Sequence, residues 1–228
     1  MKIYDRSGFP NPARIRIVLA EKGLDDAVKF VPVDLIGAEH KQEAFLSLNP
    51  SGVIPLLELD DGTLISEATA ITEYLDNLDG NPTLTGNSPK EKALVHMMQR
   101  RAEAYVLDPI GIYFHFGTPG LGPSLQAFKS PEWAGRKEWA DRNRSTVEEG
   151  FRYFNKILGS SDYVAGGFFS MADITLFAGL AFGDAAGVHV PEELGNLIAW
   201  RGRVNSLPSV QNRSGQTFLP EDAKRLGF

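Results

Sequence analysis

The pattern of apolar residues changes once along this chain, near residue 80, and this change limits the possible folds more than any other feature. Before it, short apolar runs typical of strands alternate with helical patterns, in the order βαβ, a short helical stretch, a β-hairpin and a helix. After it, only helical patterns follow. Residues 79–89, DGNPTLTGNSP, are rich in the residues typical of linkers. The sequence therefore predicts an α/β domain at residues 1–79, a linker at 80–88 and an all-helical domain at 89–228.

Local spacing predicts the elements of the first domain. A helical pattern at residues 14–22 ends at Gly23, and Asp60-Asp61-Gly62 between two apolar runs is typical of a hairpin turn. After the hairpin, apolar residues repeat as on one face of a helix, at Ile71, Tyr74, Leu75 and Leu78. The predicted strands are residues 2–5, 28–35, 55–59 and 63–65.

The second domain begins with a helix start signal. Ser88, Pro89 and Glu91 match a capping box with proline in the first helical position. The final polar segment, residues 214–228, is expected to fold back over the helices. Long helical patterns cover residues 89–114, 131–158, 171–187 and 192–205.

Composition excludes several classes of function. The chain has no cysteine, which rules out disulfides, thiolate metal sites and thiol–disulfide exchange by the protein itself. A net charge of -6 without a basic run argues against a nucleic-acid partner. No apolar run approaches the roughly 18 residues of a membrane helix, and the opening Met-Lys-Ile-Tyr-Asp is typical of a strand. We therefore expect a cytoplasmic protein without a membrane partner.

The segment Val53-Ile54-Pro55 has two interpretations. It is either a loop that enters a strand, where a leading proline is tolerated, or a cis-proline turn. In the second case Ile54 presents its backbone N–H and C=O as a free edge, which can bind the backbone of a peptide.

The segment Glu67-Ala68-Thr69 also has two interpretations. It opens a helix, where free N–H groups favour a carboxylate. Glu67 either complements the dipole of its own helix or accepts the ammonium group of a ligand.

Taken together, Ser51-Gly52-Val53-Ile54-Pro55 and Glu67-Ala68-Thr69-Ala70-Ile71 resemble the glutathione site of the cytosolic glutathione S-transferases. The resemblance covers nearly the whole chain and continues at Ser170-Met171-Ala172-Asp173-Ile174, which is similar to the family's capping box, with Asp173 in a structural role. It implies a thioredoxin-like first domain, glutathione as co-substrate without a metal, and a homodimer that conjugates hydrophobic electrophiles in detoxification. The chain further resembles a fungal and bacterial subfamily that lacks the usual catalytic Tyr or Ser. This resemblance lies at residues 12–17, 38–41, 58–65 and 114–122.

The resemblance assigns each part of glutathione to a set of residues. His40 or Lys41 would bind the glycyl carboxylate, and Ile54 would bind the cysteinyl unit through its backbone. Many relatives have Ser where this chain has Ala68, so the backbone N–H remains there, with Thr69 as a substitute. The implied glutathione-binding residues are His40, Lys41, Val53, Ile54, Pro55, Glu67, Ala68 and Thr69.

The donor that would stabilise the glutathione thiolate is less evident, because Phe9 and Pro10 occupy the positions of the usual catalytic Ser. The polar candidates are Ser7, then Asn11, then Tyr105. In the subfamily, the resemblance implies that a bound water stabilises the thiolate instead, held by side chains of the first long helix of the second domain. Here the polar residues of that helix are Tyr105, Asp108 and Tyr113, with His115 just beyond. Gly111 stands where a relative has a hydroxyl. The implied electrophile pocket is lined by Phe9, Tyr113, Phe114 and Phe116.

Two other functions remain open. One is a non-catalytic binding or assembly module on the same scaffold, which the missing Ser or Tyr suggests. The other is a dehalogenase or isomerase that uses glutathione as coenzyme.

Overall fold

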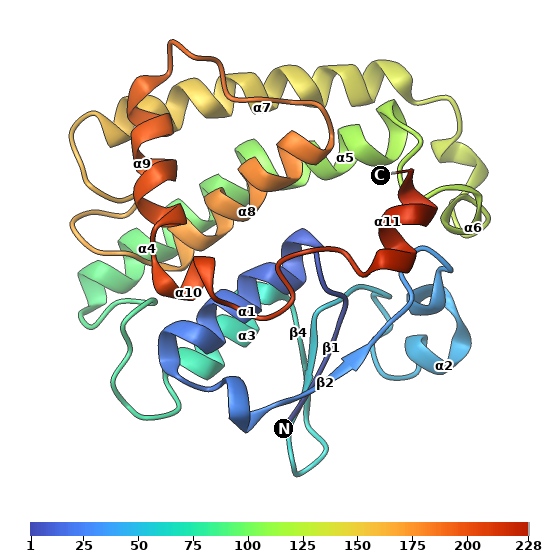
Figure 1. Ribbon diagram of the computed structural model, residues 1–228, viewed down its shortest axis with the longest axis horizontal. Helices are drawn as coiled ribbons and strands as arrows, with labels where there is room; N and C mark the ends of the chain where they lie inside the picture. The colour runs from blue at the N-terminus through green and yellow to red at the C-terminus, as the bar shows by residue number, and fades with distance from the viewer. Residues whose placement is uncertain (228) are drawn as a thin grey trace.

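The computed structural model describes residues 1–227 and has two parts, a small mixed α/β domain and a larger helical domain. In Figure 1 the first domain, blue to cyan, lies below the helical domain, and α1 and α3 lie between the sheet and the helices above. The predicted fold class, an α/β domain followed by a helical one, is confirmed.

The sheet of the first domain has four strands in the order β2-β1-β3-β4. Strand β1 pairs with β2 in parallel and with β3 antiparallel, and β3 pairs antiparallel with β4. Ile3 at the centre of β1 is fully buried and lies opposite Phe30 and Leu57. The strands are β1 (Lys2–Asp5), β2 (Lys29–Pro32), β3 (Leu56–Glu58) and β4 (Leu64–Ser66).

Helix α1 (Pro10–Lys22) begins four residues before the predicted start at residue 14. The segment from Phe9 to Pro12 resembles a turn in sequence, yet proline suits the first helical turn because the N–H groups there have no partner within the helix. Its end is as predicted, since Gly23 adopts a left-handed conformation with φ of 63°. The other helices of this domain are α2 (Glu43–Leu46), α3 (Ala68–Asp76) and the 3-10 turns η1 (Asp25–Ala27) and η2 (Glu39–Lys41).

The helical domain surrounds a buried central helix, α8 (Met171–Ala185). Both predicted capping boxes are present: Ser88 accepts from the N–H of Glu91 at 3.2 Å, and Asp173 accepts from the N–H of Ser170 at 3.0 Å. Asp173 also accepts from the Trp200 indole at 2.9 Å, so its role is structural, as predicted. The other helices are α4 (Pro89–Ala102), α5 (Asp108–Gly117), α6 (Pro123–Gln126), η4 (Pro131–Trp133), α7 (Lys137–Leu158), α9 (Gly195–Asn205), α10 (Pro208–Gln211) and α11 (Pro220–Leu226).

The predicted helix at residues 89–114 is interrupted by one π-helical segment, η3 (Glu103–Leu107). The N–H of Asp108 donates to the carbonyl of Glu103, five residues earlier. Pro109 follows and has no N–H to give to the carbonyl of Tyr105, four residues before it. Gly150 of α7 covers that carbonyl closely: a Cβ there would lie 2.4 Å from the Tyr105 oxygen, so only glycine fits.

One cluster of buried side chains runs through both domains. It joins Ile17 and Leu75 of the first domain to Val106, Phe151 and Trp200 of the second. Helix α1 packs directly on α8, so the start of α1 is held against the helical domain.

The C-terminal segment docks on the first domain, not over the helices as the sequence suggested. After α10 the chain, red in Figure 1, runs back across α1 and ends in α11. Arg6 makes two hydrogen bonds, of 2.6 and 2.8 Å, to Asp222, whose side chain is fully buried. Gly8 adopts φ of 83°, and a Cβ there would lie 2.5 Å from the backbone of Phe218. The buried ion pair and the close approach at Gly8, whose N–H donates to the carbonyl of Gly215 at 3.0 Å, both join the segment to the loop between β1 and α1, so it lies on the first domain.

Candidate functional site

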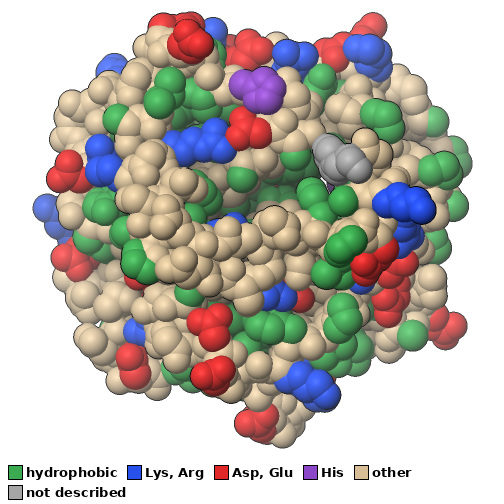
Figure 2. Space-filling view, in the orientation of Figure 1, with side chains coloured by type: hydrophobic (Ala, Val, Ile, Leu, Met, Phe, Trp, Pro, Cys, Tyr) green, Lys and Arg blue, Asp and Glu red, His purple; other side chains and the backbone are tan. Residues whose placement is uncertain are grey.

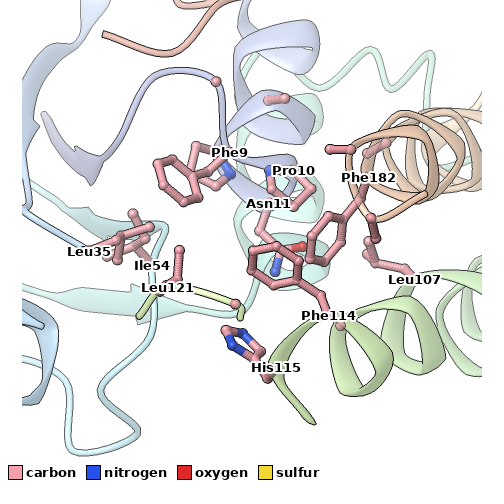
Figure 3. Close-up of a pocket in the computed structure, with 18 of the residues that line it drawn as sticks. Phe9, Pro10, Asn11, Leu35, Ile54, Leu107, Phe114, His115, Leu121 and Phe182 are labelled. Carbon is pink, nitrogen blue, oxygen red and sulfur yellow. The ribbon is translucent and has the colours of Figure 1, made fainter. Parts of the chain in front are cut away.

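A cavity of about 960 Å³ opens between the two domains and the C-terminal segment. Figure 2 shows a hollow with hydrophobic side chains on the face toward the viewer. Figure 3 shows that Phe9, Pro10 and Asn11 enter it from the start of α1, Ile54 from the loop before β3, Phe114 and His115 from α5, and Phe182 from α8. The walls are mainly apolar, as is typical of sites for small molecules.

Ile54 lies on the cavity wall with a free backbone edge. The Ile54–Pro55 peptide bond is cis, which agrees with the second interpretation of this segment. Asn49 donates to the carbonyl of Val53 at 2.8 Å and so holds the loop in place. Within residues 1–227, neither the N–H nor the C=O of Ile54 forms a hydrogen bond. An extended peptide can therefore pair with Ile54, as it would with the edge of a sheet.

His40 and Lys41 line the cavity on the same side as Ile54. Lys41 donates from Nζ to the carbonyl of Gly52 at 2.6 Å, which leaves two of its three N–H groups for a ligand. Burial, and then the charge of Lys41, lower the pKa of His40 to about 4, so its ring is neutral at pH 7. The cation here is therefore Lys41, with His40 as a neutral hydrogen-bonding group.

Glu67 and Ala68 lie at the start of α3 and are not among the residues that line the cavity. Their neighbour Thr69 is linked through Arg14 to the lining residue Asn11. Glu67 has φ of 69°, an uncommon value for a residue with a side chain; such conformations are found most often at functional sites. Its carboxylate is exposed and forms no hydrogen bond or salt bridge within residues 1–227. The carboxylate is thus open to a cationic ligand group.

Thr69 faces a buried polar network and not the cavity. Its hydroxyl accepts from Gln99 at 2.8 Å and from Arg14 at 3.2 Å, and donates to Glu103 at 3.1 Å. With these partners in place, the hydroxyl is not available as a substitute for the Ser that relatives have at Ala68.

Arg14 connects this network to the cavity. Its guanidinium is buried and forms a salt bridge of 3.0 Å with Glu103, and it donates to Oδ1 of Asn11 at 3.1 Å. Burial lowers the pKa of Arg14, and the Glu103 carboxylate opposes this. Because Arg14 can only donate, it fixes which end of the Asn11 amide faces it. The Nδ2 donor of Asn11 is left to face the cavity, where Asn11 is a lining residue.

The other candidate donors lie elsewhere. Ser7 is in the turn before α1 and is not among the lining residues. Tyr105 is on η3, half-exposed, and packs edge-on against Tyr153 of α7. The structure therefore brings only Asn11, of the three candidates, to the cavity.

The electrophile pocket needs one correction. Phe9, Phe114 and Phe116 line the cavity as expected, but Tyr113 does not. Its hydroxyl accepts from Arg144 of α7 at 3.3 Å, because one helical turn directs neighbouring residues to different faces. The apolar wall is completed by Phe182 of α8 and Phe218 of the C-terminal segment, neither of which had a local sequence signal.

The site has two further polar side chains, His115 and Lys129, for which the sequence predicted no contact. The ring of His115 is buried, and burial, then Lys129, lower its pKa to about 4. Lys129 lies beside it in the loop after α6, so no periodic pattern indicates it. Within residues 1–227, no group of three or more His, Asp or Glu residues is placed to hold a metal ion, and no helix is long and apolar enough to cross a membrane.

A thioredoxin-like domain with a free backbone edge, an open carboxylate at a helix start and an apolar cavity beside a helical domain defines a class of glutathione-binding proteins. The models for the N-terminal and the C-terminal domain of glutathione S-transferases match residues 10–78 and 109–208. The chain belongs to the glutathione S-transferase family.

Several relatives span most of its length. Glutathione S-transferase 2 of Saccharomyces cerevisiae is 51% identical over 211 residues, which are 92% of this chain and 88% of the relative. The crystal structure of Gtt2 from Saccharomyces cerevisiae has a TM-score of 0.88 at 51% identity and covers 93% of this chain and 99% of its own. A glutathione S-transferase domain-containing protein from Marinobacter aquaeolei VT8 has a TM-score of 0.86 at 47% identity, with 92% and 100% covered.

Proposed function

We propose that this protein is a glutathione transferase that joins the thiolate of glutathione to hydrophobic electrophiles. The observation that carries the proposal is the free backbone edge of Ile54 on the wall of an apolar cavity that Lys41 also lines, with the carboxylate of Glu67, unpaired within the described residues, at the start of α3. Ile54 would pair with the cysteinyl unit, Glu67 would accept the γ-glutamyl ammonium group, and Lys41 with His40 would bind the glycyl carboxylate. Val53 and Pro55 shape the loop, and the N–H of Ala68 meets the γ-glutamyl carboxylate at the start of α3.

The thiolate would be stabilised by Asn11 and by the start of α1. A free thiol has a pKa of about 8.5, so only a few per cent is thiolate at neutral pH. The Nδ2 of Asn11 donates to the sulfur, and the N-terminal end of α1 adds a favourable potential. This assignment replaces Ser7 as the first candidate, because Asn11 is the candidate that lines the cavity. We also propose that the chain belongs to the subfamily without a catalytic Tyr or Ser, which Phe9 and Pro10 at the expected positions support.

Conjugation is tested with 1-chloro-2,4-dinitrobenzene as the electrophile. The C–S bond forms, chloride leaves and the thiol proton goes to solvent, which is followed by absorbance. Calorimetry with glutathione is run beside it. Binding of glutathione with turnover supports the transferase, while binding without turnover of any electrophile identifies the non-catalytic module.

The same proposal includes the assembly and the compartment. A homodimer is supported by the apolar side chains exposed on α4 and η3, at Leu94, Met97 and Tyr105, and light scattering tests it. A cytoplasmic location follows from the need for reduced glutathione, which that compartment maintains. For the domain boundaries we keep 1–79, 80–88 and 89–228, which the end of α3 at Asp76 and the start of α4 at Pro89 support.

A further inference from the structure

The cavity is lined by more cations than anions, although the chain as a whole is acidic. The formal net charge of the chain is -6, yet the charged lining residues are Lys41, Lys129 and Arg213 against one acid, Asp108. Asp108 accepts a hydrogen bond from Arg100 at 3.2 Å, so its charge is already balanced. The wall of the cavity is therefore suited to anionic groups.

Two of these cations belong to the helical domain, Lys129 after α6 and Arg213 after α10, and Lys129 is the one beside α5. Its Nζ donates to the carbonyl of His115 at 2.9 Å and lies 4.1 Å from the centre of the Phe116 ring. No carboxylate within residues 1–227 lies within 4.0 Å of it. An ammonium group has three N–H donors, so two are left for a ligand.

Lys129 has one clear structural role, but this role does not explain its position on the cavity wall. The carbonyl of His115 belongs to the last turn of α5, where a cation complements the helix dipole. That role uses one N–H and needs no place on the cavity wall. Lys129 is half-buried and burial lowers its pKa, so its position removes water from the ammonium group without supplying a counter-ion. A buried charge without a partner is unfavourable, and a ligand anion would relieve this.

Glutathione alone does not account for both lysines. Its glycyl carboxylate is bound by Lys41 and His40 on the side of the first domain, under the function proposed above. Lys129 enters the wall from the helical domain, against Phe116, one of the aromatic side chains that would hold the electrophile. His115 feels the charges of both Lys129 and Lys41; burial and these charges lower its pKa to about 4, so its ring is neutral and adds no positive charge at pH 7.

We infer that the electrophile bound by this site carries a carboxylate beside its apolar reactive part, and that Lys129 binds this carboxylate. The inference rests on the proposed transferase function and names the class of its second substrate. The aromatic wall takes the apolar part, while the two free N–H groups of Lys129 meet the acid group at the C-terminal end of α5.

A matched pair of electrophiles tests this, 4-chloro-3,5-dinitrobenzoate and the neutral 4-chloro-3,5-dinitrobenzamide. In both, the glutathione sulfur bonds to the ring carbon, chloride leaves and the thiol proton goes to solvent. The parent protein is expected to have a KM for the acid about tenfold below that for the amide, as for one charged hydrogen bond. Lys129→Met should remove this difference and leave the KM for the amide and the affinity for glutathione unchanged. Lys129→Arg should keep it, and Lys90→Met, at an exposed lysine outside the cavity, serves as the control.

Binding of the two preformed glutathione conjugates, measured by calorimetry, gives the same comparison without turnover. Equal affinity of the parent protein for both conjugates would overturn the inference, and so would an equal loss for both in Lys129→Met. If Lys129→Met weakens glutathione itself, but not its glycyl ethyl ester, Lys129 binds the glycyl carboxylate and the inference is wrong. A different outcome would separate the two proposals. If the protein turns over neither electrophile but binds the acidic conjugate more tightly than the neutral one, and this preference depends on Lys129, the transferase function is refuted and the acid subsite is not.

Discussion

Replacing Asn11 with alanine is expected to raise the pKa of the bound glutathione thiol. Asn11 gives its Oδ1 to Arg14 at 3.1 Å, so its Nδ2 is the group that faces the cavity. A hydrogen bond to a charged group contributes about 1.5–3 kcal/mol, and one pKa unit corresponds to about 1.4 kcal/mol. The thiol pKa should therefore rise by about one to two units in Asn11→Ala. The affinity for glutathione should change little, because the ends of the tripeptide hold it.

The thiolate absorbs in the ultraviolet, so titrating the absorbance of the glutathione complex against pH measures this pKa directly. Turnover should fall about tenfold or more at pH values below the parent pKa and approach the parent rate at high pH. Asn11→Asp is a sharper variant, because Arg14 holds one carboxylate oxygen and the other then faces the sulfur. Its thiol pKa should exceed that of Asn11→Ala.

Ser7→Ala and Tyr105→Phe are the matched controls and should titrate like the parent protein. The reasoning is refuted if Asn11→Ala leaves the thiol pKa unchanged. A shift in Ser7→Ala alone would identify Ser7 as the donor. If none of the variants shifts the pKa, the backbone N–H groups at the start of α1 and an ordered water stabilise the thiolate.

Three other predictions follow from the same structure. Glu67→Gln should weaken glutathione binding by about 1.5–3 kcal/mol in calorimetry, and a loss of turnover with unchanged affinity would contradict its role as the ammonium anchor. His40 and His115 have pKa values of about 4 against an ordinary 6.5, so the unfolded chain binds more protons between these values. The contribution of these two histidines to stability should fall as pH decreases from 6.5 to 4, while Asp173, whose burial raises its pKa to about 6, contributes in the opposite direction. Denaturant titrations of the parent and of His115→Gln isolate the histidine contribution: the variant should lower the slope of stability against pH by up to about 1.4 kcal/mol per pH unit. Asp222→Asn leaves the buried guanidinium of Arg6 with only the exposed carboxylate of Glu221, 3.5 Å away, and should expose the C-terminal segment to limited proteolysis, with a loss of unfolding free energy of up to about 3–5 kcal/mol; unchanged protection would show that the Arg6–Asp222 pair does not hold the segment.

Local patterns in the sequence predicted much of the fold. The order of strands and helices, the bounds of β1 and both capping boxes follow from residues within a few positions of one another. The cis-proline loop and the helix start that we propose for glutathione binding were also predicted locally, because a loop before a strand and a helix start are each defined by a short run. The first turn of α1 was missed, since Pro10 and Pro12 are equally typical of a turn.

Contacts between distant residues could not be predicted in this way. Arg6 and Asp222 are separated by 216 positions, and neither shows a pattern that indicates its partner. Lys129 reaches the cavity from a loop. In the sequence, Arg14 resembles any solvent-facing cation of a helix, although its side chain is buried. Tyr113 was assigned to the pocket from its neighbours Phe114 and Phe116, but its side chain points to α7.

The π-helical segment η3 has a consequence for insertions and deletions. Residues of an α-helix are separated by about 100° around its axis, and a π turn accommodates one extra residue without ending the helix. Deleting one residue between Glu103 and Leu107 would favour a regular helix, and every later side chain of α5 would turn by about 100° relative to α4. Phe114 and His115 would then leave the cavity wall, while Gly150 would no longer meet the carbonyl of Tyr105. This segment should therefore tolerate substitutions far better than the loss of a single residue.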